Sequence, residues 1–173
     1  MDRNIEPQVC NSIYLESPVG MIRISGSDVA IHEVHFLKEA PDAAVTNNPG
    51  PAPDLIMECR NQLIGYFNGS RRVFDINISQ PGTPFQNKVW NKLSGIRYGD
   101  TISYLTLAKQ LGDQKVIRAA ASANGRNNIA IIVPCHRVIG SSGDLVGFAG
   151  GLWRKKWLLD HELKFARGVQ ELF

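Results

Sequence analysis

Residues 83–123, TPFQNKVWNKLSGIRYGDTISYLTLAKQLGDQKVIRAAASA, decide how the second half of the chain folds. The stretch opens with Thr83 as a helix N-cap, Pro84 at the first helical position and Gln86 at the third, which is the arrangement of a capping box. The apolar side chains that follow recur at helical spacing: Phe85, Val89, Trp90, Leu93 and Ile96. The pattern predicts a helix with one apolar face.

Two shorter helices are predicted further along the same stretch. Ser103 can cap a helix at 104–111, and Asp113 can cap a second helix at about 115–123. Two short helices joined by a tight Gly-Asp turn are typical of a helix-turn-helix motif. The second helix is rich in alanine, with Arg118 as its main long side chain. Such a narrow helix suits entry into a nucleic-acid groove and equally suits tight packing on a neighbouring helix.

The segment after this motif carries the candidate chemistry. Residues 130–133 are an apolar run that predicts a buried strand leading into residues 134–138, PCHRV. A cysteine beside a histidine is a candidate nucleophile and base, because a base generates the attacking thiolate. Packing alone is the alternative, since free cysteine is among the most buried residue types. Side chains of neighbouring strand residues point to opposite faces, so Cys135 and His136 need either a turn after Pro134 or a bridging water.

A third polar group that orients His136 is expected in a helix at 152–164. Its predicted apolar face holds Trp153, Trp157, Leu158 and His161. Its predicted polar face holds Arg154, Lys155, Lys156 and Glu162. Glu162 is therefore a candidate orienting carboxylate and equally a candidate for a plain solvated helix position.

The first part of the chain has a different pattern. Alternating apolar residues with Gly and Asp punctuation predict an antiparallel meander, with strands at about 12–15, 21–24 and 30–37. A loop rich in proline and asparagine is predicted at 39–53. A helix at about 54–67 is expected to close at Asn68-Gly69, and a further strand at 73–78.

Charge divides the chain at the same place as the predicted elements. Gln80-Pro81-Gly82 is the expected boundary between two domains, 1–80 and 81–173. Residues 1–80 carry 6 Lys/Arg and 10 Asp/Glu, a net charge of −4, whereas residues 81–173 carry 13 and 6, a net charge of +7. A basic half favours a polyanionic partner such as nucleic acid. Chance drift of charge between the halves is the alternative.

Composition excludes several classes of protein. The chain is 43% hydrophobic and 20% charged, as in globular proteins, and it contains no run of about 18 apolar residues that could cross a membrane. Its start lacks the apolar core of a signal peptide. The cysteines, Cys10, Cys59 and Cys135, are odd in number and widely spaced, which disfavours a disulfide framework or a zinc site. We expect a cytoplasmic protein with free thiols.

A series of motifs runs in one order from Gly82 to Glu162. It comprises Phe85-Gln86 with Val89-Trp90, Gly99-Asp100-Thr101, Ser103-Tyr104, Leu107-Ala108, Arg118-Ala119, IVPCHRVIG at 132–140, Gly143, GFAGG at 147–151, Lys155, Trp157-Leu158-Leu159 and Glu162. The series closely resembles the O6-alkylguanine-DNA alkyltransferases, or methylated-DNA–protein-cysteine methyltransferases, and their constitutive bacterial type in particular. The resemblance is dense over 82–162 and looser over 1–80.

This resemblance implies a mixed α/β fold. A small antiparallel sheet of ribonuclease H-like topology would form the first domain, and a mainly helical domain with a winged helix-turn-helix-like motif the second. The implied activity is DNA repair by irreversible, single-turnover transfer of an alkyl group, mainly methyl, from O6-alkylguanine and O4-alkylthymine to Cys135. The implied partner is double-stranded DNA, gripped in the minor groove by a monomer. No metal or organic cofactor is implied.

The resemblance also assigns roles to residues. His136 is the base that acts on the cysteine through a bridging water, Glu162 orients it, and Asn127 braces the turn around the cysteine. Tyr104 pushes the phosphate of the target nucleotide and assists protonation of the leaving guanine, while Arg118 fills the gap left by the flipped nucleotide. Further DNA contacts are implied for Ser103, Ala119 and Arg126, and a substrate pocket for Val138, Phe148, Ala149 and Gly150.

Three positions depart from the common family pattern. Asn128 replaces a proline, Ala121 a glycine and Phe148 a tyrosine, and these changes bear on lesion preference rather than on the reaction. Three other functions remain as alternatives. A non-catalytic alkylation-damage sensor would lack the acceptor, which Cys135 argues against. A helix-turn-helix regulator would read the major groove, and a Cys–His hydrolase would turn over and need an oxyanion hole.

Overall fold

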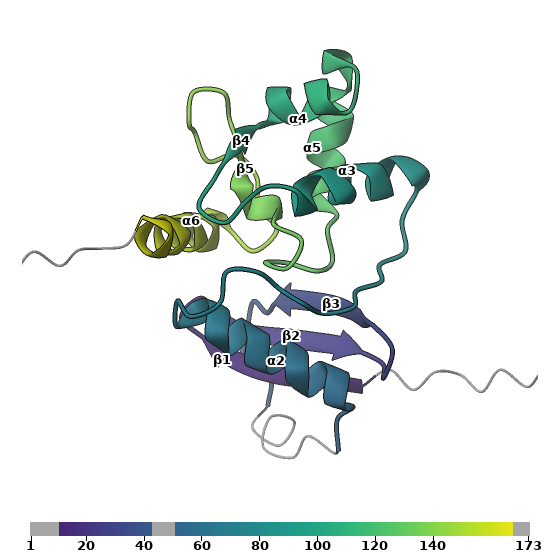
Figure 1. Ribbon diagram of the computed structural model, residues 1–173, viewed down its shortest axis with the longest axis vertical. Helices are drawn as coiled ribbons and strands as arrows, with labels where there is room; N and C mark the ends of the chain where they lie inside the picture. Colours follow the sequence, from purple (N-terminus) through teal and green to yellow (C-terminus); the bar gives the residue numbers. More distant parts are fainter. Residues whose placement is uncertain (1–10, 43–50, 168–173) are drawn as a thin grey trace, which may run out of the picture.

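The alternation of apolar residues near the start of the chain produces a three-stranded antiparallel sheet. The computed structural model describes residues 11–42 and 51–167, and its strands are β1 (Asn11–Ser17), β2 (Gly20–Gly26) and β3 (Ile31–Phe36), in the order β1-β2-β3 (Figure 1). Ile13 pairs with Ile24 and Ile22 with Phe36, and all four are buried. The predicted meander is confirmed.

Helix α2 (Asp54–Phe67) covers one face of this sheet. Its buried residues recur at helical spacing: Ile56, Cys59, Leu63 and Tyr66. The helix ends as predicted, because Gly69 adopts a positive φ of 80°, which glycine reaches without steric cost. Residues 39–42 and 51–53 contain no helix or strand, and the rest of the predicted loop lies outside the described residues, as does Cys10.

The strand predicted at 73–78 is wrong. Within residues 11–42 and 51–167, this segment forms only one isolated parallel bridge, between Ile78 and Ile31. A side chain takes the place of a strand partner, because Gln62 donates to the carbonyl of Asp75 at 2.8 Å and accepts from its amide at 2.9 Å. The backbone of Asp75 is satisfied without a sheet ladder.

The second part of the chain is mainly helical. Helix α3 (Pro84–Ser94) begins with the predicted capping box at Thr83, and β4 (Ile102–Ser103) leads into α4 (Tyr104–Gln110), which Ser103 caps. A 3-10 turn, η1 (Gln114–Val116), precedes α5 (Ile117–Gly125), and Asp113 caps the turn rather than the helix. The two-helix motif is confirmed, with its second helix starting two residues later than expected.

The alanine-rich helix α5 has one packed face and one open face. Ala120 and Ala123 are buried, and Trp90 of α3 donates its indole N–H to the carbonyl of Ala123 at 3.0 Å. Arg118 and Ala119 lie on the exposed side. Small side chains therefore serve tight packing on α3 and also leave a narrow outer surface.

The buried strand predicted at 130–133 is wrong as well. Ile131 has a φ of +70° and the segment is a run of turns, with a single parallel bridge between Val34 and Ile129. Ala130, Ile131 and Val133 are buried as predicted and Ile132 is partly buried, yet the backbone of this segment turns instead of extending. The chain straightens only at β5 (Val138–Ile139), which pairs in parallel with β4.

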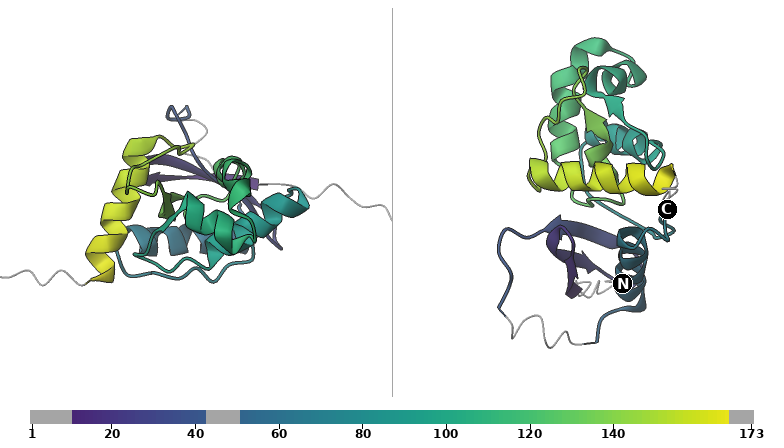
Figure 2. Two further views of the ribbon diagram at one scale, coloured as in Figure 1. Left: turned by 90° about the horizontal axis from the view of Figure 1, so that it is seen from above. Right: turned by 90° about the vertical axis from the view of Figure 1, so that its left-hand side faces the viewer.

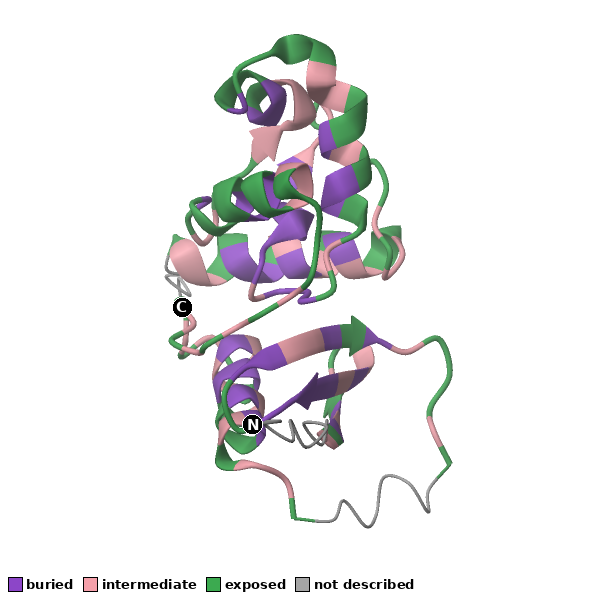
Figure 3. Ribbon diagram, turned by 90° about the vertical axis from the view of Figure 1, so that its right-hand side faces the viewer, coloured by how far each residue is buried: buried purple, intermediate pink, exposed green. Residues whose placement is uncertain are grey.

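Helix α6 (Leu152–Ala166) lies along the junction between the sheet part and the helical part (Figure 2). Its predicted faces are partly wrong, because Trp153 is 55% exposed whereas Lys155 and Glu162 are completely buried. Burial coloured along the ribbon shows the core continuing from the sheet and α2 into the helical part (Figure 3). Within the described residues, no helix is both long and apolar enough to span a membrane.

Candidate active site

The candidate nucleophile lies in a tight turn. Residues Cys135–Arg137 form a 3-10 turn, η2, directly after Pro134. Of the two alternatives left open by the sequence, the chain takes the turn, but within the described residues this turn brings neither ring nitrogen of His136 into a hydrogen bond with the Cys135 thiol. Cys135 is 6% exposed and His136 is completely buried, so both side chains sit in the protein interior.

Asn127 braces the turns that lead to the cysteine. Its Nδ2 donates to the carbonyls of Val133 at 2.8 Å and Ile129 at 3.3 Å, and its Oδ1 accepts from the amide of Ile129 at 3.1 Å. Gln80 secures it from the other side by donating to Oδ1 at 3.0 Å. The same Gln80 accepts from the amide of Asn128 at 2.9 Å, a bond that a proline at this position could not make.

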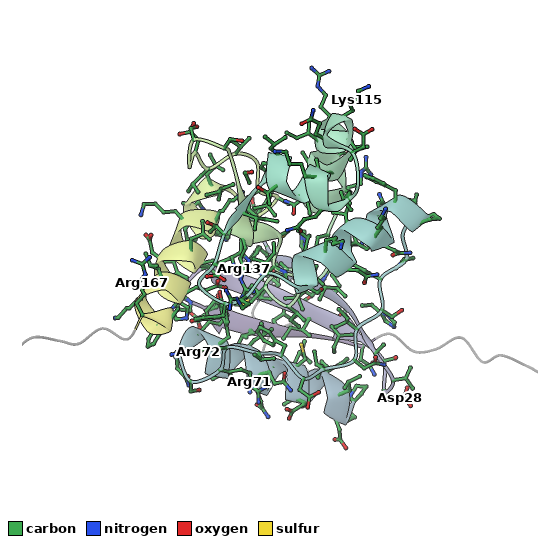
Figure 4. The ribbon with its side chains drawn as sticks, turned by 45° about the horizontal axis from the view of Figure 1, so that its top comes forward. Asp28, Arg71, Arg72, Lys115, Arg137 and Arg167 are labelled. Carbon is green, nitrogen blue, oxygen red and sulfur yellow. The ribbon has the colours of Figure 1, made fainter. Side chains whose placement is uncertain are left out.

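Glu162 of α6 joins the two residues that follow the cysteine. His136 Nε2 lies 2.7 Å from Glu162 Oε1. Arg137 donates to both carboxylate oxygens, from Nε at 2.8 Å and from Nη2 at 2.9 Å, and its Nη1 donates to the carbonyl of Ile96 at 2.6 Å. Figure 4 shows Arg137 in the interior between the two parts of the molecule. Glu162 is thus a buried, fully engaged carboxylate and not a solvated helix position.

Two further donors reach the same carboxylate. Tyr66 of α2 donates its hydroxyl to Glu162 Oε1 at 2.8 Å, and the amide of Gly99 donates to Oε2 at 3.2 Å. Burial opposes ionisation, but the hydrogen bonds and charges of His136 and Arg137 outweigh it and hold the pKa of Glu162 well below its usual range. Glu162 is therefore ionised at neutral pH.

An ionised carboxylate can only accept, which fixes the tautomer of His136. Nε2 carries the proton that faces Glu162, and Nδ1 is left as an acceptor. Within residues 11–42 and 51–167, this buried Nδ1 has no hydrogen-bond partner. Burial lowers the pKa of His136 despite the opposing effect of Glu162, so the imidazole is neutral at pH 7 and able to take a proton.

The thiol of Cys135 needs such a base. Burial raises its pKa, although a hydrogen bond from Asn127 and the charge of Lys155 partly oppose that rise. The thiol is consequently protonated at neutral pH and becomes a strong nucleophile only when its proton is removed. No group of three or more His, Cys, Asp or Glu in the described part of the chain is arranged to hold a metal ion.

Lys155 ties the loop after β5 to the site. Its completely buried ammonium donates to the carbonyls of Val138 at 2.6 Å, Val146 at 3.0 Å and Gly147 at 3.3 Å. Burial lowers the pKa of Lys155 to about 8, with the charge of the Cys135 thiolate acting in the opposite direction. Tyr104 donates its hydroxyl to Val146 from the other side at 2.9 Å. Val138 is buried beneath this loop rather than in the cavity wall.

A small cavity of about 30 Å³ lies beside Cys135. Its wall is built from β3, the end of α5, the turns before Cys135 and the loop after β5. The lining residues are Val34, His35, Phe36, Asn124, Gly125, Asn127, Ala130, Gly147, Phe148, Ala149 and Gly150. Gly150 is needed there, because a Cβ would lie 2.7 Å from Phe36 and 2.9 Å from Phe148. The predicted pocket residues Phe148, Ala149 and Gly150 are therefore brought to the cysteine.

An open groove of about 440 Å³ adjoins this cavity and shares Phe148 and Ala149 with it. Tyr104, Arg118 and Ala121 line the groove, so the first two predicted DNA-contacting side chains come together. The remaining three lie elsewhere. Ala119 is exposed on α5, Arg126 is exposed just after it, and the Ser103 hydroxyl caps α4 by accepting from the amide of Thr106 at 3.0 Å.

Comparisons with known proteins cover both parts of the chain. Residues 12–80 match the family model described as 6-O-methylguanine DNA methyltransferase, ribonuclease-like domain, and residues 84–164 match the model described as its DNA binding domain. A methylated-DNA–protein-cysteine methyltransferase of Methanosarcina acetivorans is 44% identical over 152 residues, which are 85% of this chain and 94% of the relative. The chain belongs to the methylated-DNA–protein-cysteine methyltransferase family.

Solved structures of family members agree with the fold. A crystal structure of Mycobacterium tuberculosis OGT in complex with DNA superposes with a TM-score of 0.79 at 39% identity, covering 89% of this methyltransferase and 93% of that chain. The curated relative from Mycobacterium tuberculosis is 40% identical over 159 residues, or 92% of this chain and 96% of that one. The mixed α/β architecture is thus common to both.

Sequence reasoning missed four residues of this methyltransferase site. Arg137 was part of a quoted motif but was given no role, and Tyr66 and Gln80 come from the first part of the chain. Lys155 was assigned to the polar face of its helix. Its spacing of three and seven residues from buried Leu158 and Glu162 is the signal that places all of them on one face.

Proposed function

We propose that this methyltransferase repairs DNA by moving an alkyl group, mainly methyl, from O6-alkylguanine onto Cys135 in a single irreversible turnover, and that O4-alkylthymine is a second substrate. One observation carries the proposal. Cys135 lines a small cavity that adjoins an open groove, and the next residue is a neutral buried histidine whose orientation a carboxylate fixes. This is the arrangement that activates a buried nucleophile.

The geometry supports a defined sequence of bond changes. His136 Nδ1 takes the thiol proton through a bridging water, while Glu162 stabilises the resulting imidazolium through Nε2–H. The sulfur attacks the alkyl carbon, a carbon–sulfur bond forms, and the bond from that carbon to O6 breaks with its electron pair leaving on guanine. Tyr104, which lies in the groove, assists protonation of the guanine. The product is a thioether with no leaving group to restore the thiol.

We further propose that the groove receives the minor-groove side of duplex DNA. The net charge of +7 over residues 81–173 favours phosphate binding. A base must leave the stack to reach Cys135, which costs a few kcal/mol. Arg118 is exposed on α5 at the groove and is long enough to fill the gap, since an arginine side chain stacks well on bases.

The remaining sequence-based assignments belong to the same proposal. We propose that residues 1–80 and 81–173 are separate domains and that the protein acts in the cytoplasm as a monomer without a cofactor. Additional DNA contacts are proposed for Ser103, Ala119 and Arg126. The exposure of Ala119 and Arg126 supports this role for those two residues. The presence of an acceptor cysteine disfavours the damage sensor, and the sparse long side chains on α5 disfavour a major-groove regulator.

Replacement of the acceptor tests this proposal. Cys135→Ser is expected to abolish alkyl transfer from a methylguanine duplex while DNA affinity, measured at fixed salt, stays within about threefold of wild type, because phosphate contacts dominate affinity. Cys59→Ala is the matched control, since Cys59 lies on the buried face of α2 with its pKa raised to about 12 by burial and by Glu58. Transfer by the serine variant, or loss of DNA binding with the fold intact, would contradict the proposal.

A further inference from the structure

Tyr66 links the sheet part of the molecule directly to the reacting groups. It comes from α2, is completely buried, and donates its hydroxyl to Glu162 Oε1 at 2.8 Å. The same oxygen accepts from His136 Nε2 at 2.7 Å. Arg137 Nη2 is a third donor to this oxygen, at 2.9 Å. Tyr66, from the sheet part of the molecule, therefore shares one carboxylate oxygen with two donors from the helical part, and one of those two is the candidate base.

The packing of the Tyr66 ring fixes the position of its hydroxyl. Its ring packs against four others, with centroid distances of 5.4 Å to Phe67, 5.7 Å to Phe74, 6.0 Å to Tyr98 and 5.3 Å to His161. His161 also donates from Nε2 to the backbone carbonyl of Tyr66 at 2.7 Å. Burial, together with the charge of Glu162, raises the pKa of Tyr66, so its hydroxyl is a permanent donor.

We propose that Tyr66 is a positioning residue for the alkyl transfer, which fixes the Glu162 carboxylate against His136 and limits how strongly that oxygen attracts the imidazole proton. The inference rests on the proposed function, because it concerns the base of that reaction. A hydrogen bond to a carboxylate oxygen withdraws negative charge from it, so each donor weakens the pull on the other. Tyr66 thereby helps to keep His136 neutral and ready to accept the thiol proton.

The other groups around this pair are held by hydrogen bonds that do not involve the Tyr66 hydroxyl. From η2, Arg137 binds both oxygens of Glu162, and the Gly99 amide binds Oε2. The charges of Arg137 and Lys155 both lower the pKa of His136, and the Tyr98 hydroxyl is the other titratable group beside Glu162. Apart from Tyr66 and His136, the donor to Oε1 is Arg137 Nη2, which is already bound to that oxygen. Loss of the Tyr66 hydroxyl therefore leaves more negative charge on Oε1, and that charge strengthens its hydrogen bond with His136.

The test compares two tyrosines that differ in this one bond. Tyr66→Phe removes the hydroxyl and keeps the ring. Tyr98→Phe is the matched control, because the buried Tyr98 hydroxyl has no hydrogen-bond partner within the described residues. The single-turnover rate of methyl transfer from duplex DNA is measured from pH 5.5 to 9 for both variants and wild type. Tyr66→Phe is expected to move the acidic limb upward by about 0.5 pH unit with its plateau within about threefold of wild type. Tyr98→Phe should follow the wild-type profile.

A second variant tests the role of the Tyr66 hydroxyl even if Tyr66→Phe does not fold. Replacing Tyr66 by 3,5-difluorotyrosine retains the ring and makes the hydroxyl a stronger donor, so the acidic limb should move downward. A limb that stays fixed in both variants, whether or not the plateau falls, would reduce Tyr66 to packing support and overturn the inference. Absence of transfer in wild type and in Tyr98→Phe would instead overturn the proposed function, and the inference with it.

Discussion

Glu162→Gln tests the buried carboxylate that orders the site. The side chain of Glu162 is 1% exposed and that of Arg137 is 7% exposed, and the pair is bidentate. Glutamine removes the charge and turns one acceptor into a donor that faces other donors. Removing one partner of a buried ion pair costs about 3–5 kcal/mol, which corresponds to a fall in Tm of about 6–20 °C for a chain of this size.

The same change should slow the reaction. His136 loses the acceptor that fixes its tautomer and stabilises its protonated form. General-base assistance is typically a factor of 10² or more, so the single-turnover rate is expected to fall by about 10²-fold. The amplitude of the single-turnover phase, which counts the alkyl groups transferred per protein, should equal that of wild type, because the carboxylate does not accept the alkyl group. Melting is followed by circular dichroism, and transfer is measured well below the lower Tm.

Asp160→Asn is the control on the same helix. Asp160 is 61% exposed, and its ion-pair partner among the described residues is Lys156, so this amidation should cost at most about 0.5 kcal/mol and leave transfer unchanged. The reasoning would be refuted if Glu162→Gln melted within 2 °C of Asp160→Asn, or if it transferred the alkyl group at the wild-type rate.

Two further predictions concern the groove and the cavity. Arg118→Ala should slow transfer from duplex DNA far more than transfer from free alkylated base, since the side chain helps only when a base leaves the stack; equal losses on both substrates would exclude that role. Gly150→Ala should reduce transfer of benzyl groups more than methyl, because its Cβ would lie 2.7 Å from Phe36 and 2.9 Å from Phe148 at the cavity wall. Unchanged competition between benzylated and methylated free guanine would show that Gly150 does not limit adduct size.

Much of the fold could be predicted because it depends on local signals. The capping box at Thr83 and the cap at Ser103 formed as expected, since each needs only residues three positions apart. The two wrong strands have a common cause. Residues 73–78 and 130–133 have the composition of strands, but side chains far away in sequence, Gln62 in the first case and Gln80 through Asn127 in the second, satisfy or redirect their backbone.

Site residues that lie within a sequence motif could be predicted, whereas those that only the folded chain brings together could not. Cys135 and His136 are adjacent in sequence, and the resemblance pointed to Glu162. The contact from Tyr66 joins residues 96 positions apart, and no periodicity in the sequence encodes such a pairing. Burial of Lys155 was missed for a different reason: a lysine is almost never fully buried, so composition argued against its actual position under the loop after β5.

The central claim is that Cys135 is consumed by one alkyl group, and stoichiometry measures this most directly. Wild-type protein is incubated with excess methylguanine duplex, the reaction is followed to completion, and the intact mass and a peptide map are recorded. We predict one exponential phase whose amplitude equals the active protein, no steady-state rate after it, and one added methyl on the peptide that contains Cys135. Repeated turnover, or a methyl group found on Cys10 or Cys59, would contradict the account.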